Sequence, residues 1–121
     1  MTPLRVAVIG AGAFGRNHVR AISQMDGVEL AAVVDADIDK ARALATEFPA
    51  KVVRELSEVF GQVDAAVVAT PTVTHETIAT RLLEAGIDVL VEKPIADSAA
   101  AGERLTKLAE RQGRILQVGH L

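Results

Sequence analysis

The sequence predicts an α/β fold with a doubly wound, parallel sheet of six strands in the order 3-2-1-4-5-6. Three observations favour this fold. Short Val- and Ile-rich runs recur along the chain without polar alternation, which is typical of strands buried on both faces. Stretches with helical spacing of apolar residues separate these runs. Ala and Val dominate the apolar half of the composition, and small side chains allow helices to lie close to a sheet.

The apolar runs place the strands along the chain. They are Leu4–Ile9, Val28–Val34, a weaker run at Lys51–Val53, and residues 64–69, 87–91 and 114–118. Residues 56–60 are expected to form one or two helical turns. Because parallel strands need crossover connections, the helical stretches between the runs fit a parallel sheet. This pattern alone leaves another three-layer sandwich open, such as a flavodoxin-like one, and the loops must decide between them.

Each of four expected helices has an apolar face with residues three or four positions apart. These faces are Gly15, Val19 and Ile22; Ile38, Ala41, Ala45 and Phe48; Ile78, Leu82 and Ala85; and Ala101, Leu105 and Leu108. Thr74 and residues 97–98 are typical helix starts. Pro49, Gly86 and Gly113 are typical helix ends.

The composition excludes several classes of protein. The 121 residues are expected to form one domain, residues 1–121, which is large enough to bury a core. A net charge of −3 without a basic cluster argues against nucleic-acid binding. We find no apolar stretch near the ~18 residues of a membrane span and no secretory signal, so we expect a cytoplasmic protein without a membrane partner. The absence of Cys excludes disulfides and thiolate sites, and no His or carboxylate pair has metal-ligand spacing.

A glycine-rich loop follows the first expected strand and opens the first helix. Its sequence is Gly10-Ala11-Gly12-Ala13-Phe14-Gly15. We expect Gly10 to allow a tight turn, Gly12 to let a pyrophosphate approach the backbone, and Gly15 to let the helix pack close to the sheet. The free N–H groups near Ala13 and Phe14 would bind the phosphates at the helix N-terminus. The loop therefore predicts a dinucleotide site.

Asp35 supports this interpretation because it ends the second strand 20 residues after the loop. A carboxylate there accepts hydrogen bonds from the adenosine ribose and repels a 2′-phosphate. The next residues, Ala36 and Asp37, offer that phosphate no cation, so we predict NAD rather than NADP as the cofactor. Two alternatives stay open: a nucleoside ligand such as S-adenosylmethionine, and glycines that serve packing only beside a solvated Asp35.

Lys93 follows the fifth expected strand, in the sequence Glu92-Lys93-Pro94. Ligands of open α/β sheets bind beyond the carboxyl ends of the strands. An ammonium group there can stabilise the alkoxide that develops when a hydride leaves a substrate carbon. From spacing alone, an ion pair with Glu92 or another carboxylate, or a solvated loop, is the favoured explanation. Pro94 restricts Lys93 to an extended conformation and is a candidate for a cis peptide bond.

The three histidines have different expected places. His75 follows the fourth strand and the sequence Thr70-Pro71, and it could either face the cofactor or cap the helix. His18 lies in the first helix beside its charged side, which favours a surface position. The surroundings of His120 cannot be inferred from a position next to the last residue.

Taken together, these motifs resemble those of a known family. They are residues 10–15, Asp35, Ala69-Thr70-Pro71 with His75, Glu92-Lys93-Pro94, and Gln117-Val118-Gly119-His120. In this order they are similar to the N-terminal domain of the glucose–fructose oxidoreductase, inositol dehydrogenase and MocA family. The resemblance covers the whole chain and implies an NAD(P)-dependent oxidoreductase that acts on sugars, cyclitols, nucleotide-linked sugars or related hydroxyl compounds.

The resemblance also implies roles for individual residues. Lys93 matches a lysine beside the nicotinamide and the substrate, and Glu92 matches a residue near the nicotinamide end. Thr70, Pro71 and His75 match the loop that lines the dinucleotide. Asp35 matches the position that selects NAD in many members.

The chain departs from the family in one respect. Members have a second, C-terminal domain that supplies most substrate contacts, the usual catalytic acid or base and much of the oligomer interface, and this sequence lacks it. We therefore expect a cofactor domain that has no turnover alone and that could form homo-oligomers. The alternatives are a dinucleotide-binding regulatory module, like those attached to potassium channels, and a Rossmann scaffold used for assembly. A regulatory module does not need Glu92-Lys93-Pro94 with Thr70-Pro71, and a scaffold would not bind NAD.

Overall fold

The structure is a computed structural model that describes residues 2–119. Strands and helices alternate along the chain, as the sequence pattern predicts. The strands are β1 (Leu4–Ile9), β2 (Val28–Val34), β3 (Lys51–Val53), β4 (Ala65–Val68), β5 (Asp88–Glu92) and β6 (Leu116–Gly119). The helices are α1 (Ala13–Ser23), α2 (Ile38–Glu47), α3 (His75–Glu84) and α4 (Ala99–Gln112), with 3₁₀ turns η1 (Leu56–Val59) and η2 (Thr72–Thr74).

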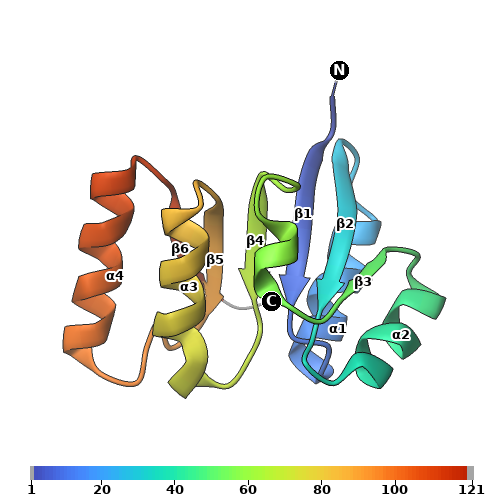
Figure 1. Cartoon of the computed structure of the whole chain (residues 1–121), viewed down its shortest axis with the longest axis horizontal. Coiled ribbons are helices and arrows are strands. Elements are labelled where there is room, and N and C mark those ends of the chain that lie inside the picture. Colours follow the sequence, from blue (N-terminus) through green and yellow to red (C-terminus); the bar gives the residue numbers. More distant parts are fainter. Residues whose placement is uncertain (1, 120–121) are drawn as a thin grey trace.

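The six strands form one sheet in the order β3-β2-β1-β4-β5-β6, and all neighbouring pairs are parallel. This confirms the predicted order and excludes a flavodoxin-like sheet, in which the order is 2-1-3-4-5. The arrowheads of the strands point to the lower edge of the view in Figure 1. The β1–α1, β2–α2, β4–α3 and β5–α4 connections therefore meet at the carboxyl edge of the sheet, where a ligand site is expected.

The last strand begins two residues later than its apolar run predicts. Gly113 ends α4 in the left-handed region, with φ of 65°. The N–H of Arg114 then donates to the carbonyl of Ala109 at 3.0 Å, which closes the last helical turn. The backbone of Arg114 therefore completes the helix end, and Ile115 bonds to residues 88 and 89 at the start of β5 just before β6 begins. The other strand boundaries lie within one residue of the prediction.

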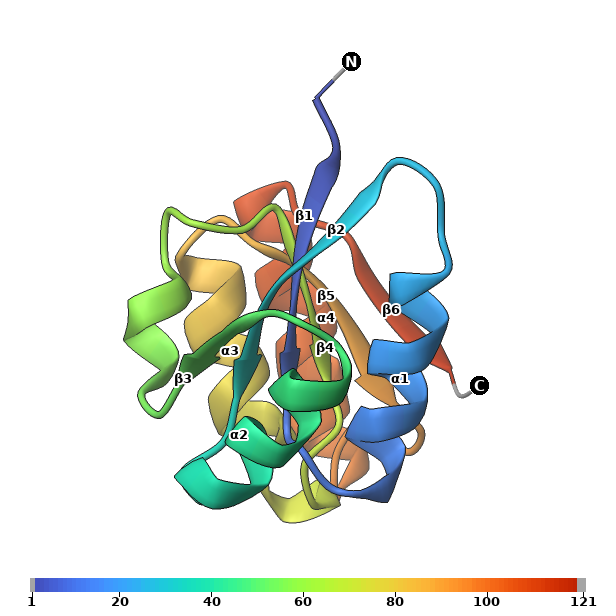
Figure 2. The same cartoon turned by 90° about the vertical axis from the view of Figure 1, so that its right-hand side faces the viewer.

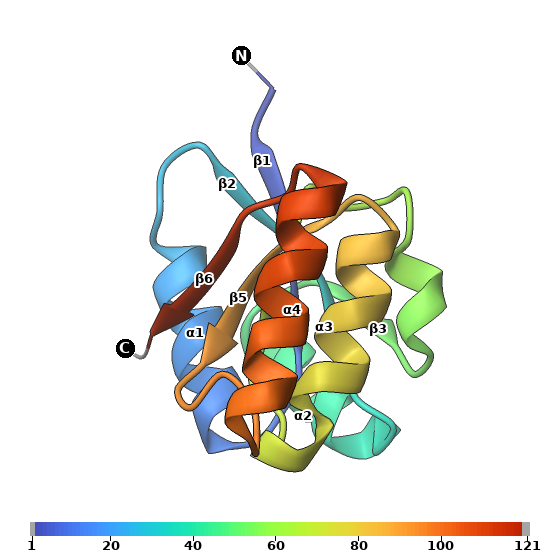
Figure 3. The same ribbon diagram turned by 90° about the vertical axis from the view of Figure 1, so that its left-hand side faces the viewer.

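Helices cover the two faces of the sheet in pairs, α1 and α2 on one face and α3 and α4 on the other (Figures 2 and 3). Alternate residues of β1 enter different cores: Val6 and Val8 pack under α1 and α2, while Ala7 and Ile9 pack under α3 and α4. Burial on both faces explains why the strand sequences show no polar alternation. Within residues 2–119, no helix combines the length and the apolar character needed to cross a membrane.

The helix starts fix the loops at the carboxyl edge. The Ser98 hydroxyl accepts a hydrogen bond from the N–H of Ala101 at 3.1 Å, which confirms the predicted start of α4. Thr74 precedes α3 as predicted but does not cap it with its side chain. Its hydroxyl instead lies 2.6 Å from both the Thr70 hydroxyl and the Pro71 carbonyl, so it stabilises the β4–α3 loop.

Candidate functional site

The glycine loop turns sharply between β1 and α1. Gly10 has φ of +105°, a conformation that residues with a side chain rarely adopt, and a Cβ added there would lie 2.7 Å from the carbonyl oxygen of Ala69. Gly15 is closer still to its neighbours, since its Cβ would lie 1.8 Å from the carbonyl oxygen of Gly10. Gly15 thus allows the loop to close on itself, which is a tighter constraint than the helix–sheet packing predicted for it.

Gly12 has different surroundings from the other two glycines of the loop. A Cβ added at Gly12 would meet no atom within 4 Å. The residue is the N-cap of α1, no side chain caps that helix end, and the first turn carries no acidic residue. The first N–H groups of a helix lack partners within the helix and favour an anion. The open space and the helix end together fit the pyrophosphate of a dinucleotide.

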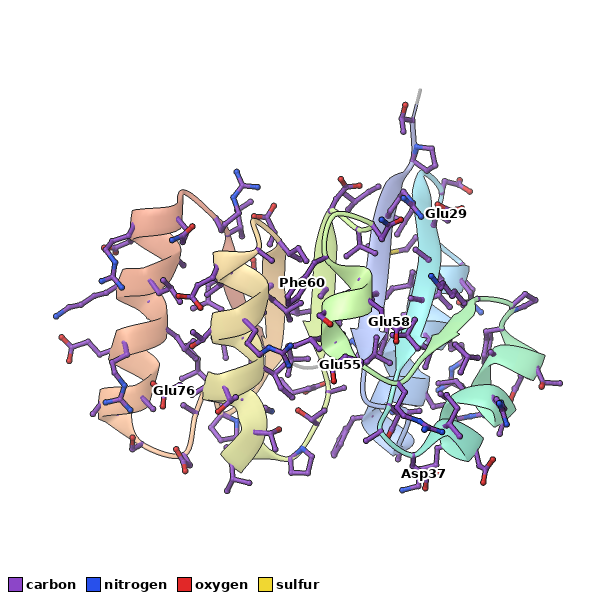
Figure 4. All side chains as sticks on the ribbon, viewed as in Figure 1. Glu29, Asp37, Glu55, Glu58, Phe60 and Glu76 are labelled. Atoms are coloured by element: carbon purple, nitrogen blue, oxygen red, sulfur yellow. The ribbon has the colours of Figure 1, made fainter. Side chains whose placement is uncertain are left out.

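Asp35 lies at the end of β2, and two backbone N–H groups hold its carboxylate. Ala11 donates to Oδ2 at 2.8 Å and Asp37 donates to Oδ1 at 2.9 Å. Figure 4 labels Asp37 at the start of α2, below the carboxyl edge of the sheet. Because each carboxylate oxygen can accept a second hydrogen bond, Asp35 keeps the capacity to bind ribose hydroxyls in a fixed orientation.

Two adjacent cavities lie along the carboxyl edge, with volumes of about 730 and 550 Å³. Gly12, Ala69, Thr70 and Pro71 line both, and we call the two cavities together the groove. All predicted site residues except the buried Gly15 line this groove. The larger cavity holds Ala13, Phe14, His75, Glu92 and Lys93, and the smaller one holds Gly10 and Asp35.

Cations also line the smaller cavity, although the sequence around Asp35 suggests none. Lys40 and Arg54 line it together with Asp35. Arg54 follows β3, so it approaches Asp35 through the pairing of β3 with β2 rather than through sequence proximity. The residues directly after Asp35 offer no cation, as the sequence shows, but the fold brings Lys40 and Arg54 to the same cavity. A third cation, Arg81, is paired with Glu55 at 3.1 Å, and its hydrogen bond lowers the pKa of Glu55.

Lys93 is exposed at the end of its strand, which agrees with the alternative of a solvated loop. Among residues 2–119, no carboxylate lies within 4.0 Å of its ammonium group, so the predicted alternative of an ion pair is not seen. The Lys93–Pro94 peptide bond is cis, as the sequence suggests. The ammonium group is therefore available at the larger cavity.

His18 is buried, with 3% of its surface exposed, so the predicted surface position was wrong. Its Nε2 contacts a carboxylate oxygen of Glu92 at the end of β5. A signal for burial exists in the sequence. His18 lies three residues after Gly15 and four before Ile22, on the apolar face of the helix. The partner could not be identified because it is 74 residues away.

His75 is also buried, with 1% exposure, and it contacts two loops of the site. Its Nδ1 lies 3.0 Å from the carbonyl oxygen of Pro94, and its Nε2 lies 2.9 Å from that of Thr70. A neutral imidazole donates to one carbonyl, and an imidazolium donates to both. The residue lines the larger cavity without capping a helix through its side chain. His120 lies outside the described residues.

No group of three or more His, Asp or Glu side chains in the described part of the chain is arranged to hold a metal ion.

Solved structures with similar folds bind nicotinamide dinucleotides. GenD2 from gentamicin A biosynthesis, solved in complex with NAD, superimposes with a TM-score of 0.95 at 39% identity and covers 98% of this chain and 35% of its own. A 3-ketoreductase from Actinomadura kijaniata, solved with NADP and TDP-benzene, gives a TM-score of 0.91 at 29% identity and covers 97% of this chain and 37% of its own.

Sequence comparison leads to the same family. Inositol 2-dehydrogenase 1 from Saccharopolyspora erythraea is 41% identical over 124 residues, which are 98% of this chain and 37% of that protein. The chain thus spans a little over a third of the length of such relatives. The family described as "oxidoreductase family, NAD-binding Rossmann fold" matches residues 4–120. The chain therefore belongs to this family, that of glucose–fructose oxidoreductase, inositol dehydrogenase and MocA.

Proposed function

We propose that this chain binds NAD along the carboxyl edge of its sheet and forms the cofactor-binding part of a dehydrogenase. The substrate would carry the CH–OH group of a sugar, a cyclitol or a nucleotide-linked sugar. One observation carries the proposal: a single groove connects the uncapped N-terminus of α1, the Asp35 carboxylate and the Lys93 ammonium group. A relative named as an inositol dehydrogenase and a neighbour solved with NAD support it.

The binding residues divide the groove by chemistry. The N–H groups of Ala13 and Phe14 would bind the phosphates, with Gly12 leaving room for them. Asp35 would accept hydrogen bonds from the adenosine ribose at one end. Thr70, Pro71, His75 and Glu92 would line the nicotinamide end.

Lys93 would act on the substrate. NAD, held by these residues, would supply the acceptor for a hydride from the carbon that carries the hydroxyl group. The Lys93 ammonium group would donate a hydrogen bond to the hydroxyl oxygen and stabilise the negative charge that develops on it. The hydroxyl proton must pass to a general base. We propose that this base and most substrate contacts lie in a C-terminal domain outside these 121 residues, because the relatives are almost three times as long.

Calorimetric titration of the chain with NAD tests the binding step. We expect saturable binding of NAD and of ADP-ribose, which shares the phosphates and the adenosine. Nicotinamide mononucleotide is the matched control and should bind much more weakly, because it lacks the group that Asp35 binds. The absence of binding at millimolar NAD would contradict the proposal. Turnover of a panel of polyols by the chain alone would contradict the assignment of the base to another domain.

A second and independent part of the proposal is that the chain forms homo-oligomers. Leu4, Met25 and Ile115 are exposed apolar side chains around a cavity of about 310 Å³ beside α1. Exposed apolar patches of this kind mark association surfaces. Light scattering after gel filtration should show an assembly that Ile115→Lys disrupts. A monomer at all concentrations tested would contradict this part alone.

A further inference from the structure

The two residues that flank Lys93 are each held by a buried histidine. His18 contacts the Glu92 carboxylate, and His75 lies 3.0 Å from the Pro94 carbonyl. His18 belongs to α1 and His75 to α3, and these helices lie on opposite faces of the sheet (Figures 2 and 3). The Lys93 backbone is therefore anchored from both sides of the sheet while its side chain stays exposed.

The contact between His18 and Glu92 is largely shielded from water. The side chains are 4% and 12% exposed. A buried carboxylate without a hydrogen-bond donor is strongly unfavourable, so the position of Glu92 depends on the imidazole ring. The same ring lies one helical turn after Gly15, in α1, whose N-terminal N–H groups are proposed to bind the phosphates. The pair thus connects the phosphate-binding helix directly to the strand that carries Lys93.

His75 contacts the residue on the other side of Lys93, from the opposite face of the sheet. Its two ring nitrogens lie within hydrogen-bond distance of carbonyl oxygens in two loops, at Thr70 and Pro94. Both loops line the larger cavity. Since the contacts are to backbone atoms, they set the distance between the β4–α3 loop and the β5–α4 loop.

We propose that His18 and His75 are positioning residues that together fix Lys93 at the nicotinamide end of the groove. They act on Lys93 through its neighbours Glu92 and Pro94 rather than through direct contact with its side chain. The consequence for catalysis rests on the proposed function, whereas the anchoring itself is a property of the chain without cofactor.

Hydrogen exchange measured residue by residue by NMR tests the anchoring. The Lys93 N–H donates to the Gly119 carbonyl at 3.1 Å, and at the other end of β5 the Val89 N–H donates to the Ile115 carbonyl at 2.9 Å. In His18→Leu, we expect exchange at Lys93 to be faster by about tenfold or more, while Val89 changes by less than about threefold. His18→Gln, whose amide can still donate to Glu92, should restore most of the protection at Lys93.

Val19→Ala is the matched control on the same helix face. Val19 is fully buried but has no part in the contact with Glu92. This variant should be less stable and should accelerate both amides equally. If His18→Leu also changes both amides equally, or changes neither, the inference is wrong. If His18→Leu does not fold, the same comparison is made with His75→Gln and Glu92→Gln, and equal changes at Lys93 and Val89 in both variants would overturn the inference.

A second measurement separates this inference from the proposed function. The lysines are labelled with ¹³C-methyl groups, and the Lys93 resonance is followed as NAD is added. In the unchanged chain NAD should shift this resonance, and in His18→Leu the shift should fall by about half or more while the NAD affinity changes by less than about threefold. A chain that binds no NAD would contradict the proposed function, and the exchange data would still decide the anchoring.

Discussion

The two ends of the groove are built in different ways. At the adenosine end, backbone N–H groups of Ala11 and Asp37 hold the Asp35 carboxylate, and a short glycine loop makes the turn. At the nicotinamide end, buried side chains hold the backbone, through His18 on Glu92 and His75 on Pro94. The first end is specified by local conformation, and the second by packing between helices on opposite faces of the sheet. Mutations should therefore affect the two ends through different mechanisms.

Gly15→Ala should have the largest effect on stability, because it directly disrupts the glycine loop at the adenosine end of the groove. The added Cβ would lie 1.8 Å from the Gly10 carbonyl oxygen, which is backbone and cannot rotate away. We expect a loss of about 3 kcal/mol or more in the free energy of unfolding, as is found for severe overpacking. Urea denaturation followed by circular dichroism measures it. A change below about 1 kcal/mol would show that the loop rearranges easily.

Gly12→Ala is the matched control in the same loop. Its Cβ would enter open space, and the residue has φ of −79°, which alanine adopts without strain. Its stability should therefore change by less than about 1 kcal/mol. Its affinity for NAD should fall by about tenfold or more, since the methyl group would fill the space proposed for the pyrophosphate. Unchanged affinity would place the phosphates elsewhere.

Asp35→Asn tests the chemistry of the adenosine end with a smaller effect. We choose Asn because the carboxylate also accepts two backbone hydrogen bonds, and the amide oxygen can keep one of them. Loss of the negative charge should weaken NAD binding and relieve repulsion of a 2′-phosphate. We expect the ratio of NAD to NADP affinity to fall by about tenfold. An unchanged ratio would contradict the assignment.

Arg54→Gln sharpens the same test. Arg54 lines the cavity with Asp35 and is a candidate partner for a 2′-phosphate. This variant should lower the affinity for NADP by about fivefold and leave the affinity for NAD within about twofold. Equal losses for both cofactors would mean that Arg54 contacts a part that they share.

The contrast between the two ends also explains what the sequence could predict. The glycine turn and Asp35 follow from patterns within about 25 residues, and the strand order follows from the alternation of strands and helices along the chain. The structure confirms their places in the fold. The partner of His18 is 74 residues away, on a strand that the sequence around His18 does not identify. Arg54 is a related case, because only the pairing of β2 with β3 brings it near Asp35.

The variant with the smallest expected effect changes Glu76, a partly exposed neighbour of the buried His75. It tests whether burial of a side chain, or only its position near the loop, controls the nicotinamide end. Glu76 follows His75 at the start of α3, where Figure 4 labels it, and its carboxylate accepts hydrogen bonds from Arg104 of α4, one of them at 2.9 Å. The pair is exposed to solvent, and the Arg104 hydrogen bond lowers the pKa of Glu76 from its usual value of 4.5. A lowered pKa in the folded state stabilises the fold above pH 4.5, and this contribution is lost as the pH falls through the folded-state pKa.

Glu76→Gln should therefore lower the melting temperature slightly at pH 7, and the difference from the unchanged chain should shrink as the pH falls below 4.5. Added salt should reduce it as well, because exposed charges are screened. Thermal unfolding at several pH values measures both effects. The hydrogen-exchange rate at Lys93 should not respond, since Glu76 contacts α4 and not the loop that His75 holds. If the exposed pair altered Lys93 as much as His75→Gln does, position along the helix rather than burial would control the nicotinamide end.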